Sequence, residues 1–149
     1  MKIMYDLSIK LLSPFVTIHA ARQDAHTDAL AQAIQQAAEP LTVIGRNDKR
    51  RRAIPIYAIN RCYHEGKAVY CELVDDSERY QLTQPIYQLA EILPPNLFLR
   101  VSQSEIIRIA FIKDFSLTKA GMYQVNLRDG STTFASRRYT QKLRKDVLK

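Results

Sequence analysis

Glycine, cysteine and tryptophan are scarce in this 149-residue sequence, which has four, two and none of them respectively. The glycines stand at positions 45, 66, 121 and 130 and form neither GxxxxGK(S/T) nor GxGxxG, so a loop that cradles nucleotide phosphates is hard to build. No apolar run approaches the roughly 20 residues that cross a bilayer, and residues 1–6 alternate polar and apolar side chains instead of forming a signal peptide. We therefore expect a cytoplasmic protein without nucleotide chemistry.

Metal-binding and catalytic motifs are also missing. Cys62 and Cys71 stand nine positions apart with no second pair, which disfavours a four-ligand zinc site and a disulfide framework and predicts two buried thiols. His19, His26 and His64 lie in separate segments, with no HExxH and no serine or cysteine nucleophile motif. We expect no metal, no cofactor, no small-molecule substrate and no enzymatic activity.

The net charge of +7 is concentrated in the last third of the sequence. The first 99 residues carry 11 basic and 11 acidic side chains, whereas residues 100–149 carry 11 basic and 4 acidic ones. The overall composition, 46% hydrophobic and 25% charged, is typical of an ordinary globular domain. A basic region of this kind can attract nucleic acid, but charge alone is equally compatible with a merely solvated face.

Residues 1–50 are predicted to form a strand–helix–strand extension. Alternating or β-branched residues indicate strands over 2–9, 15–18 and 41–44. Between them Leu30 and Ile34 recur at helical spacing, Asp24 or Thr27 can cap the helix, and Pro40 follows its end. Residues 1–45 carry three basic and four acidic side chains, so this extension is a poor candidate for touching nucleic acid and a natural place for dimerisation.

From residue 46 the pattern is mainly β, with α+β character overall, and residues 51–149 are predicted to form the second domain. Turn residues separate the predicted strands, which fall near 54–61, 67–74, 78–82, 97–101, 106–115, 122–128 and 132–136. Two helices are predicted, one over 84–93 before Pro94-Pro95 and a basic one over 137–148. Many short strands in one chain favour a meander, a sandwich or a small barrel.

Two polar, arginine-bearing segments, 100–104 and 136–138, are separated by strands that can bring them to one end of a sheet. Serine hydroxyls and backbone N–H groups suit phosphates, glutamine can pair with an adenine edge, and arginine can pair with a guanine edge. The two segments are therefore a candidate nucleic-acid surface, while a solvated basic face remains the alternative.

The sequence resembles the LytTR family of bacterial DNA-binding domains, of the LytR, AlgR and AgrA type, including its stand-alone members that lack a receiver domain. The resemblance covers about residues 53–149 and extends, in its strand–helix–strand pattern, to the first 50 residues. Its most specific features are Phe98-x-Arg100-x-x-x-Ser104, Asp129-Gly130 about 30 residues later, and the run 136–139, which reads Ser-Arg-Arg-Tyr. The segment 80–93, which reads as a strand and then a short helix, fits as well.

This resemblance implies a three-sheet β fold over residues 51–149 that reads double-stranded DNA with loops inserted into successive major grooves. Gln103 and Arg138 fall at base-contacting positions of the family. Ser102, Ser104 and Ser136 fall at backbone-contacting positions of the family. Independently of the resemblance, the charges of Arg100, Arg137, Lys142 and Lys145 make them expected backbone contacts or supporting residues. The loop 63–67 corresponds to a third insertion, in which either His64 or Lys67 could contact DNA.

Several residues keep a second interpretation. Arg100 could bond strand ends instead of DNA, and only one of the adjacent Arg137 and Arg138 should read a base, because side chains at neighbouring helix positions diverge. Glu105 and Arg108 depart from the family pattern, and Glu105 could face away, pair with Arg108 or alter the site. The cationic run 49–52 is either a solvated hairpin or a phosphate-tracking segment. The eight tyrosines are predicted in the core and on sheet surfaces.

The resemblance also implies partners beyond DNA. A homodimer or cooperative pair would match the paired half-sites that such domains bind, and an inhibitory membrane protein is a further implied partner. Two other functions remain open on the sequence alone: a nonspecific nucleic-acid or RNA-binding β module, and a protein-interaction domain with an incidental basic face.

Overall fold

The computed structural model describes residues 2–7, 16–38, 41–139 and 141 of the chain. It divides into two compact units, Met1–Glu39 and Pro40–Lys149. The division falls between Glu39 and Pro40 instead of near residue 50, because the strand predicted over 41–44 belongs to the sheet of the second unit. No helix in the described part of the chain is long and apolar enough to cross a membrane.

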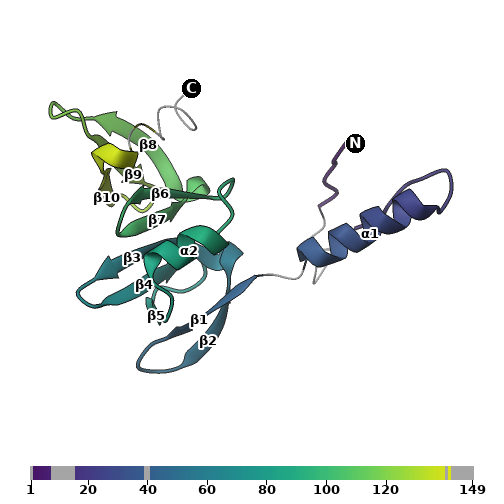
Figure 1. Ribbon diagram of the computed structural model, residues 1–149, viewed down its shortest axis with the longest axis horizontal. Coiled ribbons are helices and arrows are strands. Elements are labelled where there is room, and N and C mark those ends of the chain that lie inside the picture. The colour runs from purple at the N-terminus through teal and green to yellow at the C-terminus, as the bar shows by residue number, and fades with distance from the viewer. Residues whose placement is uncertain (1, 8–15, 39–40, 140, 142–149) are drawn as a thin grey trace. The chain divides into compact units, whose positions relative to one another are not determined.

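The described residues of the first unit form one helix, α1 (Ala25–Ala38), coloured blue-purple in Figure 1. Asp24 caps the helix, which is one of the two predicted alternatives. Its Oδ1 accepts the backbone N–H of Thr27 at 3.0 Å, and Thr27 Oγ1 accepts the backbone N–H of Asp24 at 2.8 Å. The prediction of strands over 2–9 and 15–18 is wrong where it can be checked, because residues 2–7 and 16–18 form no strand. Residues 8–15 lie outside the described part. A strand needs a partner for its backbone groups, and the described residues of this unit supply none.

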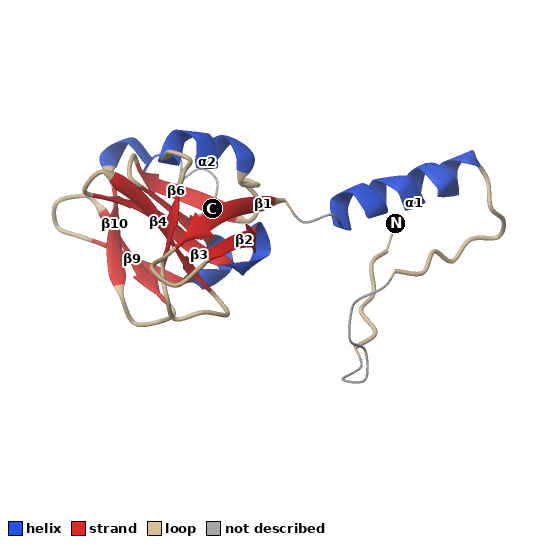
Figure 2. Cartoon of the chain, turned by 90° about the horizontal axis from the view of Figure 1, so that it is seen from below, coloured by secondary structure: helices blue, strands red, loops and turns tan. Residues whose placement is uncertain are grey.

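In the part of the second unit that the structure describes, the strands form two antiparallel sheets (Figures 1 and 2). The larger has the order β2-β1-β5-β4-β3-β7-β6 and the smaller the order β10-β9-β8. The strands are β1 (Thr42–Arg46), β2 (Arg51–Pro55), β3 (Ile59–Glu65), β4 (Ala68–Leu73), β5 (Tyr80–Leu82), β6 (Phe98–Ser102), β7 (Glu105–Arg108), β8 (Ile112–Leu117), β9 (Tyr123–Leu127) and β10 (Thr132–Ala135).

The mainly β expectation is confirmed, with two hydrogen-bonded sheets in the described residues where the resemblance implied three. The larger sheet is continuous because β3 pairs on both of its edges. Cys62 of β3 faces Cys71 of β4 on one side and Ile106 of β7 on the other. Strands that could have formed two separate sheets are therefore joined along β3.

Two predicted strands are broken by short 3₁₀ helices. The run 54–61 is interrupted by η1 (Ile56–Ala58), and the run 106–115 by η2 (Ile109–Phe111). The second break carries the chain from β7 in the larger sheet to β8 in the smaller one. Apolar residues continue through both corners, so their periodicity could not reveal the change of direction.

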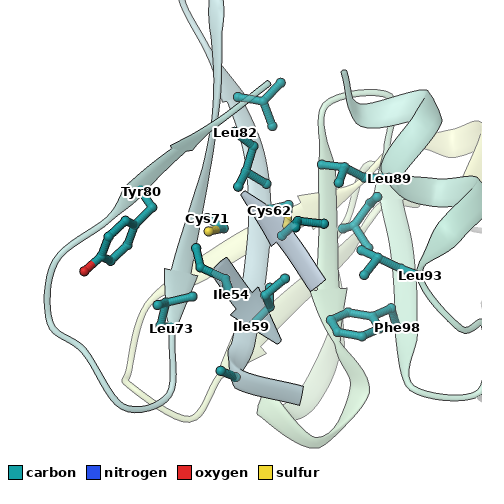
Figure 3. Packing of buried hydrophobic residues seen from close by; sticks show 14 of the residues in the cluster. Ile54, Ile59, Cys62, Cys71, Leu73, Tyr80, Leu82, Leu89, Leu93 and Phe98 are labelled. Carbon is teal, nitrogen blue, oxygen red and sulfur yellow. The ribbon is translucent and has the colours of Figure 1, made fainter. Parts of the chain in front are cut away.

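Two hydrophobic cores lie on opposite faces of the β6–β7 hairpin. Phe98 and Ile106 belong to the first core, which α2 (Ile86–Ile92) covers with Leu89 (Figure 3). Leu99, Val101 and Ile107 belong to the second core, which also includes Val125, Leu127 and Ala135 of the smaller sheet. Since both faces of this hairpin are packed, the turn at its end, residues 103–104, is presented from a rigid support.

Cys62 and Cys71 are free thiols buried opposite each other in the first core (Figure 3), which confirms the prediction of two buried thiols. Burial raises the pKa of Cys62 well above its ordinary value and that of Cys71 to about 12. Both side chains therefore act as small hydrophobic residues.

Gly45 of β1 occupies a position with no space for a side chain. A Cβ there would lie 2.5 Å from Ile54 Cδ1 and 2.8 Å from Tyr80 Cβ. We expect Gly45→Ala to lower the free energy of unfolding by about 1–3 kcal/mol, because two buried side chains would have to shift. Urea unfolding measures this, with Thr42→Ala at an exposed position of the same strand as the control. Equal unfolding midpoints for both variants would contradict the packing.

Candidate nucleic-acid interface

The turn between β6 and β7 forms the first of two tips, which we call tip 1 (residues 102–104). Gln103 and Ser104 are exposed there, as the sequence predicts for DNA contacts. Ser102 Oγ lies 3.2 Å from Ser104 Oγ and also accepts the backbone N–H of Ser104 at 3.2 Å. Arg100 Nε and Nη2 donate to the carbonyl oxygens of Ser102 and Gln103, each at 3.1 Å. The turn is thus held by bonds to its own backbone, which leaves the Gln103 side chain in solvent.

The hairpin between β3 and β4 lies beside tip 1. The N–H of His64 donates to the carbonyl of Ser104 at 2.8 Å. Gly66 has φ 62° at the first position of the two-residue turn, the pattern of a type II′ hairpin. His64 and Lys67 are both exposed, but only His64 lines the hollow that also includes Gln103. Of the two predicted candidates in this loop, the structure brings His64 to tip 1.

The segment after β10 forms the second tip, which we call tip 2 (residues 136–139). Its first residue is tied to β6, because the N–H of Ser136 donates to the carbonyl of Val101 at 2.9 Å. Residues 137–139 are helical, in agreement with the start of the predicted C-terminal helix. Arg137 and Arg138 are both exposed. The predicted contacts Lys142 and Lys145 lie outside the described residues.

Tip 1, tip 2 and the β3–β4 hairpin surround one open hollow of about 440 Å³. Its lining joins both predicted base-reading residues with neighbours from four elements: His64, Ile86, Tyr87, Arg100, Gln103, Ser104, Arg138 and Tyr139. Arg137 is not among them, so the divergence expected for adjacent helix positions is observed. Segments nearly 40 residues apart in the sequence thus present side chains to a common surface.

Glu105 does not oppose this surface as an unpaired charge. It is 9% exposed, its Oε2 accepts the hydroxyl of Thr133 at 2.6 Å, and its Oε1 lies 3.4 Å from Arg61 Nη1. Burial raises its pKa, although Thr133 and Arg61 oppose that effect. The alternative of a pair with Arg108 is wrong, since Arg108 Nε donates to the carbonyl of Ile59 at 2.7 Å.

The cationic run 49–52 lies at the hairpin between β1 and β2, and acidic residues that follow β4 pair with most of it. Arg50 Nη2 lies 2.6 Å from Asp76, Arg52 Nη2 lies 2.8 Å from Asp75, and Lys49 pairs with Glu78. The pKa of Asp76 is lowered to about 2, mainly because its carboxylate accepts the N–H of Glu78 and the hydroxyl of Tyr80, with a further contribution from Arg50. Of the two interpretations of this run, the structure favours the hairpin over a phosphate-tracking segment.

Two tyrosines of the hollow were missed by sequence reasoning, which placed all tyrosines in the core or on sheets. Tyr87 is 59% exposed on α2, whose Ile86 and Leu89 point inward. Tyr139 is half-buried in tip 2. The outward position of Tyr87 could have been read from the helical spacing of its neighbours, but the proximity of either residue to Gln103 could not.

The fold and this surface define a class: a β domain in which two exposed, polar, arginine-bearing segments border a common hollow. The LytTr DNA-binding domain model matches residues 49–147, so the chain belongs to the LytTR DNA-binding domain family and is a DNA-binding protein of that kind.

Relatives and a solved structure agree with this assignment. The chain is 25% identical over 144 residues to an uncharacterized HTH-type transcriptional regulator of Staphylococcus aureus strain MSSA476, covering 97% of this chain and 96% of that protein. The corresponding regulator of strain N315 is 24% identical over the same length. The structure resembles a LytTr DNA-binding domain of a methyl-accepting/DNA response regulator from Bacillus cereus, with a TM-score of 0.64 and 16% identity over 70% of this chain and 94% of that one. This structural likeness shows the fold.

Proposed function

We propose that the protein is a transcriptional regulator that recognises specific duplex DNA sequences through tips 1 and 2, inserted into the major groove. One observation carries the proposal: Gln103 and Arg138, which come from distant segments, are both exposed on the lining of the same hollow. Similarity to proteins named as transcriptional regulators supports the regulatory role. The chemistry of the two side chains supports base recognition.

Each residue then has a distinct role. Gln103 would pair with an adenine edge and Arg138 with a guanine edge, both of which are readable in the major groove. Ser102 and Ser104 of tip 1 would donate to phosphates, as would the backbone, whereas Ser136, whose Oγ is buried, would support tip 2. Arg137, Lys142 and Lys145 would supply salt-dependent affinity by releasing counterions, without sequence preference. His64 would contact the backbone beside tip 1.

Selection of bound molecules from a random duplex pool tests this proposal. We expect enrichment of a defined sequence that the protein binds at least about 10³-fold more tightly than random duplex, the lower end for specific regulators. Salt titration of both duplexes should give steep slopes, because phosphate contacts dominate the affinity of each. Recovery of random sequence would contradict the proposal and favour a nonspecific nucleic-acid module. No binding at low salt would favour a protein-interaction domain instead.

We further propose that the first unit dimerises the protein. Its described residues carry apolar side chains that remain 67–87% exposed in the single chain, namely Ile3, Met4, Tyr5, Leu7 and Val16. On α1, Leu30 and Ile34 lie at helical spacing on a partly buried face. Exposed apolar groups of this kind, on a unit without excess positive charge, favour contact with a second copy.

Analytical ultracentrifugation of the full chain tests the dimer. We expect the wild type to sediment as a dimer and Ile34→Glu as a monomer, because a carboxylate would be buried in the contact. Gln35→Glu places the same charge at an exposed neighbouring position of α1 and should leave the dimer intact. A monomeric wild type, or a dimer in all three proteins, would contradict the assignment.

A further inference from the structure

We propose that Arg100 is a positioning residue that couples tip 1 to tip 2 through the ring of Tyr139, and that it does not itself bind DNA phosphate. The inference rests on the proposed function and deepens it, because it identifies what keeps the two base-reading side chains at a fixed separation.

The contacts of Arg100 with tip 1 use two of the five N–H donors of its guanidinium group. Nε and Nη2 donate to two successive carbonyls, those of Ser102 and Gln103. The pairing of β6 with β7 shifts its register between Arg100 and Ser102, so the ladder is irregular where the turn begins. A planar guanidinium can serve both carbonyls at once, whereas a lysine ammonium lacks that fork.

The contact of Arg100 with tip 2 is made through an aromatic ring. The guanidinium carbon of Arg100 lies 5.4 Å from the centroid of Tyr139, and that of Arg138 lies 5.8 Å from the same centroid. Both distances are within the range of cation–π attraction. The N–H of Tyr139 donates to the carbonyl of Ser136 at 3.0 Å, which fixes the backbone that carries the ring. The ring thus links Arg100 to the residue proposed to read guanine.

This linkage matters because both tips must meet their bases at the same time. Successive bases on one strand are separated by about 3.4 Å along the helix axis, so a small change in the separation of the tips misaligns at least one of them. Side chains that recognise a ligand specifically have to be held within about 0.5 Å of their binding geometry by the residues that support them. Arg100 supports the Gln103 backbone directly and the Arg138 side chain through Tyr139.

Binding measurements on four full-length variants separate positioning from phosphate contact. Arg100→Lys keeps the charge and Tyr139→Phe keeps the ring, whereas Arg100→Gln and Tyr139→Leu remove them. We expect Arg100→Lys, Arg100→Gln and Tyr139→Leu each to weaken binding to the selected duplex about tenfold, within the range for one bidentate base contact. Binding to random duplex and the salt slope should stay at wild-type values, and Tyr139→Phe should match the wild type throughout.

The opposite pattern would overturn the proposal. If Arg100→Lys bound like the wild type, while Arg100→Gln weakened both duplexes alike and reduced the salt slope by about one, Arg100 would be a phosphate ligand. Thermal melting of each variant identifies any general loss of folding. Should Arg100→Gln melt early, Tyr139→Leu, which leaves the hairpin hydrogen bonds in place, provides the decisive comparison.

A measurement without DNA keeps this inference distinct from the proposed function. In ¹H–¹⁵N spectra of the free protein, Tyr139→Leu should shift the amides of residues 102–104, and Arg100→Gln should shift those of 136–139. Shifts confined to the substituted segment would overturn the coupling. If these shifts appear but the wild type shows no preference among duplexes, the coupling stands and the proposed sequence recognition fails.

Discussion

Replacing Arg61 by alanine is expected to lower the free energy of unfolding by about 3 kcal/mol, because it leaves the buried Glu105 without its cationic partner. Arg61 lies on β3, an interior strand of the larger sheet, and its side chain is 20% exposed. Its Nε and Nη2 also bind Glu72 at 2.8 and 2.9 Å. Glu72 is 32% exposed and can be solvated when the pair is lost, whereas the Glu105 side chain, 11% exposed, cannot.

The position of Glu105 explains why the cost is large. Through Thr133 of β10 it joins the larger sheet to the smaller one, directly beside tip 1. A charge left unpaired at this junction would weaken the contact between the sheets. Urea unfolding measures the loss, and Arg79→Ala, which breaks the exposed pair with Glu65, should cost less than Arg61→Ala.

Two further measurements identify the cause of this loss. Adding Glu105→Gln to Arg61→Ala should recover part of the stability, since it removes the buried charge but keeps an acceptor for Thr133. Because burial raises the pKa of Glu105 in the folded protein, protonation of Glu105 favours the folded state. The free energy of unfolding that Arg61→Ala loses should therefore become smaller as the pH falls toward 4.5, the ordinary pKa of a glutamate. A loss within about 0.5 kcal/mol for Arg61→Ala would contradict the role of the pair.

The second large effect is expected at tip 2. Arg138→Ala should weaken binding to the selected duplex by about 1–3 kcal/mol and flatten its preference over random DNA, because a bidentate guanine contact would be lost. Arg137 provides a matched control: it is adjacent and exposed but does not line the hollow. Arg137→Ala should weaken both duplexes alike and reduce the salt slope by about one.

Competition binding at several salt concentrations distinguishes the two variants. Equal losses of affinity for selected and random duplex in Arg138→Ala would show that this residue binds only the DNA backbone. A loss of preference in Arg137→Ala together with none in Arg138→Ala would exchange their roles.

Local chemistry in the sequence was sufficient for much of the fold. The hairpin after β9 follows from Asp129-Gly130, and Gly130 adopts φ 85° there. The end of α2 follows from Pro94-Pro95, and the start of α1 from Asp24. The strands expected in residues 2–9 failed because alternation states only that a strand could form. It does not supply the neighbour with which a strand must pair.

Long-range pairing explains what the sequence could not predict about the site. The two tips were expected at one end of a sheet, and the structure brings residues of both to one hollow. The partner of Glu105, however, is Arg61, 44 residues earlier, which becomes a neighbour only because β3 pairs with β7. Tyr139 likewise gains its importance from the approach of Arg100. Neither relation has a signature in local spacing or charge.

Methylation interference on the selected duplex tests the central claim most directly, because dimethyl sulfate modifies guanine N7 in the major groove and adenine N3 in the minor groove. We predict that methylation of specific guanines blocks binding by the wild type, that Arg138→Ala loses this sensitivity at one guanine per half-site, and that adenine N3 methylation there has little effect. Identical interference patterns for the wild type and Arg138→Ala, or interference only at adenine N3, would contradict major-groove reading by tip 2.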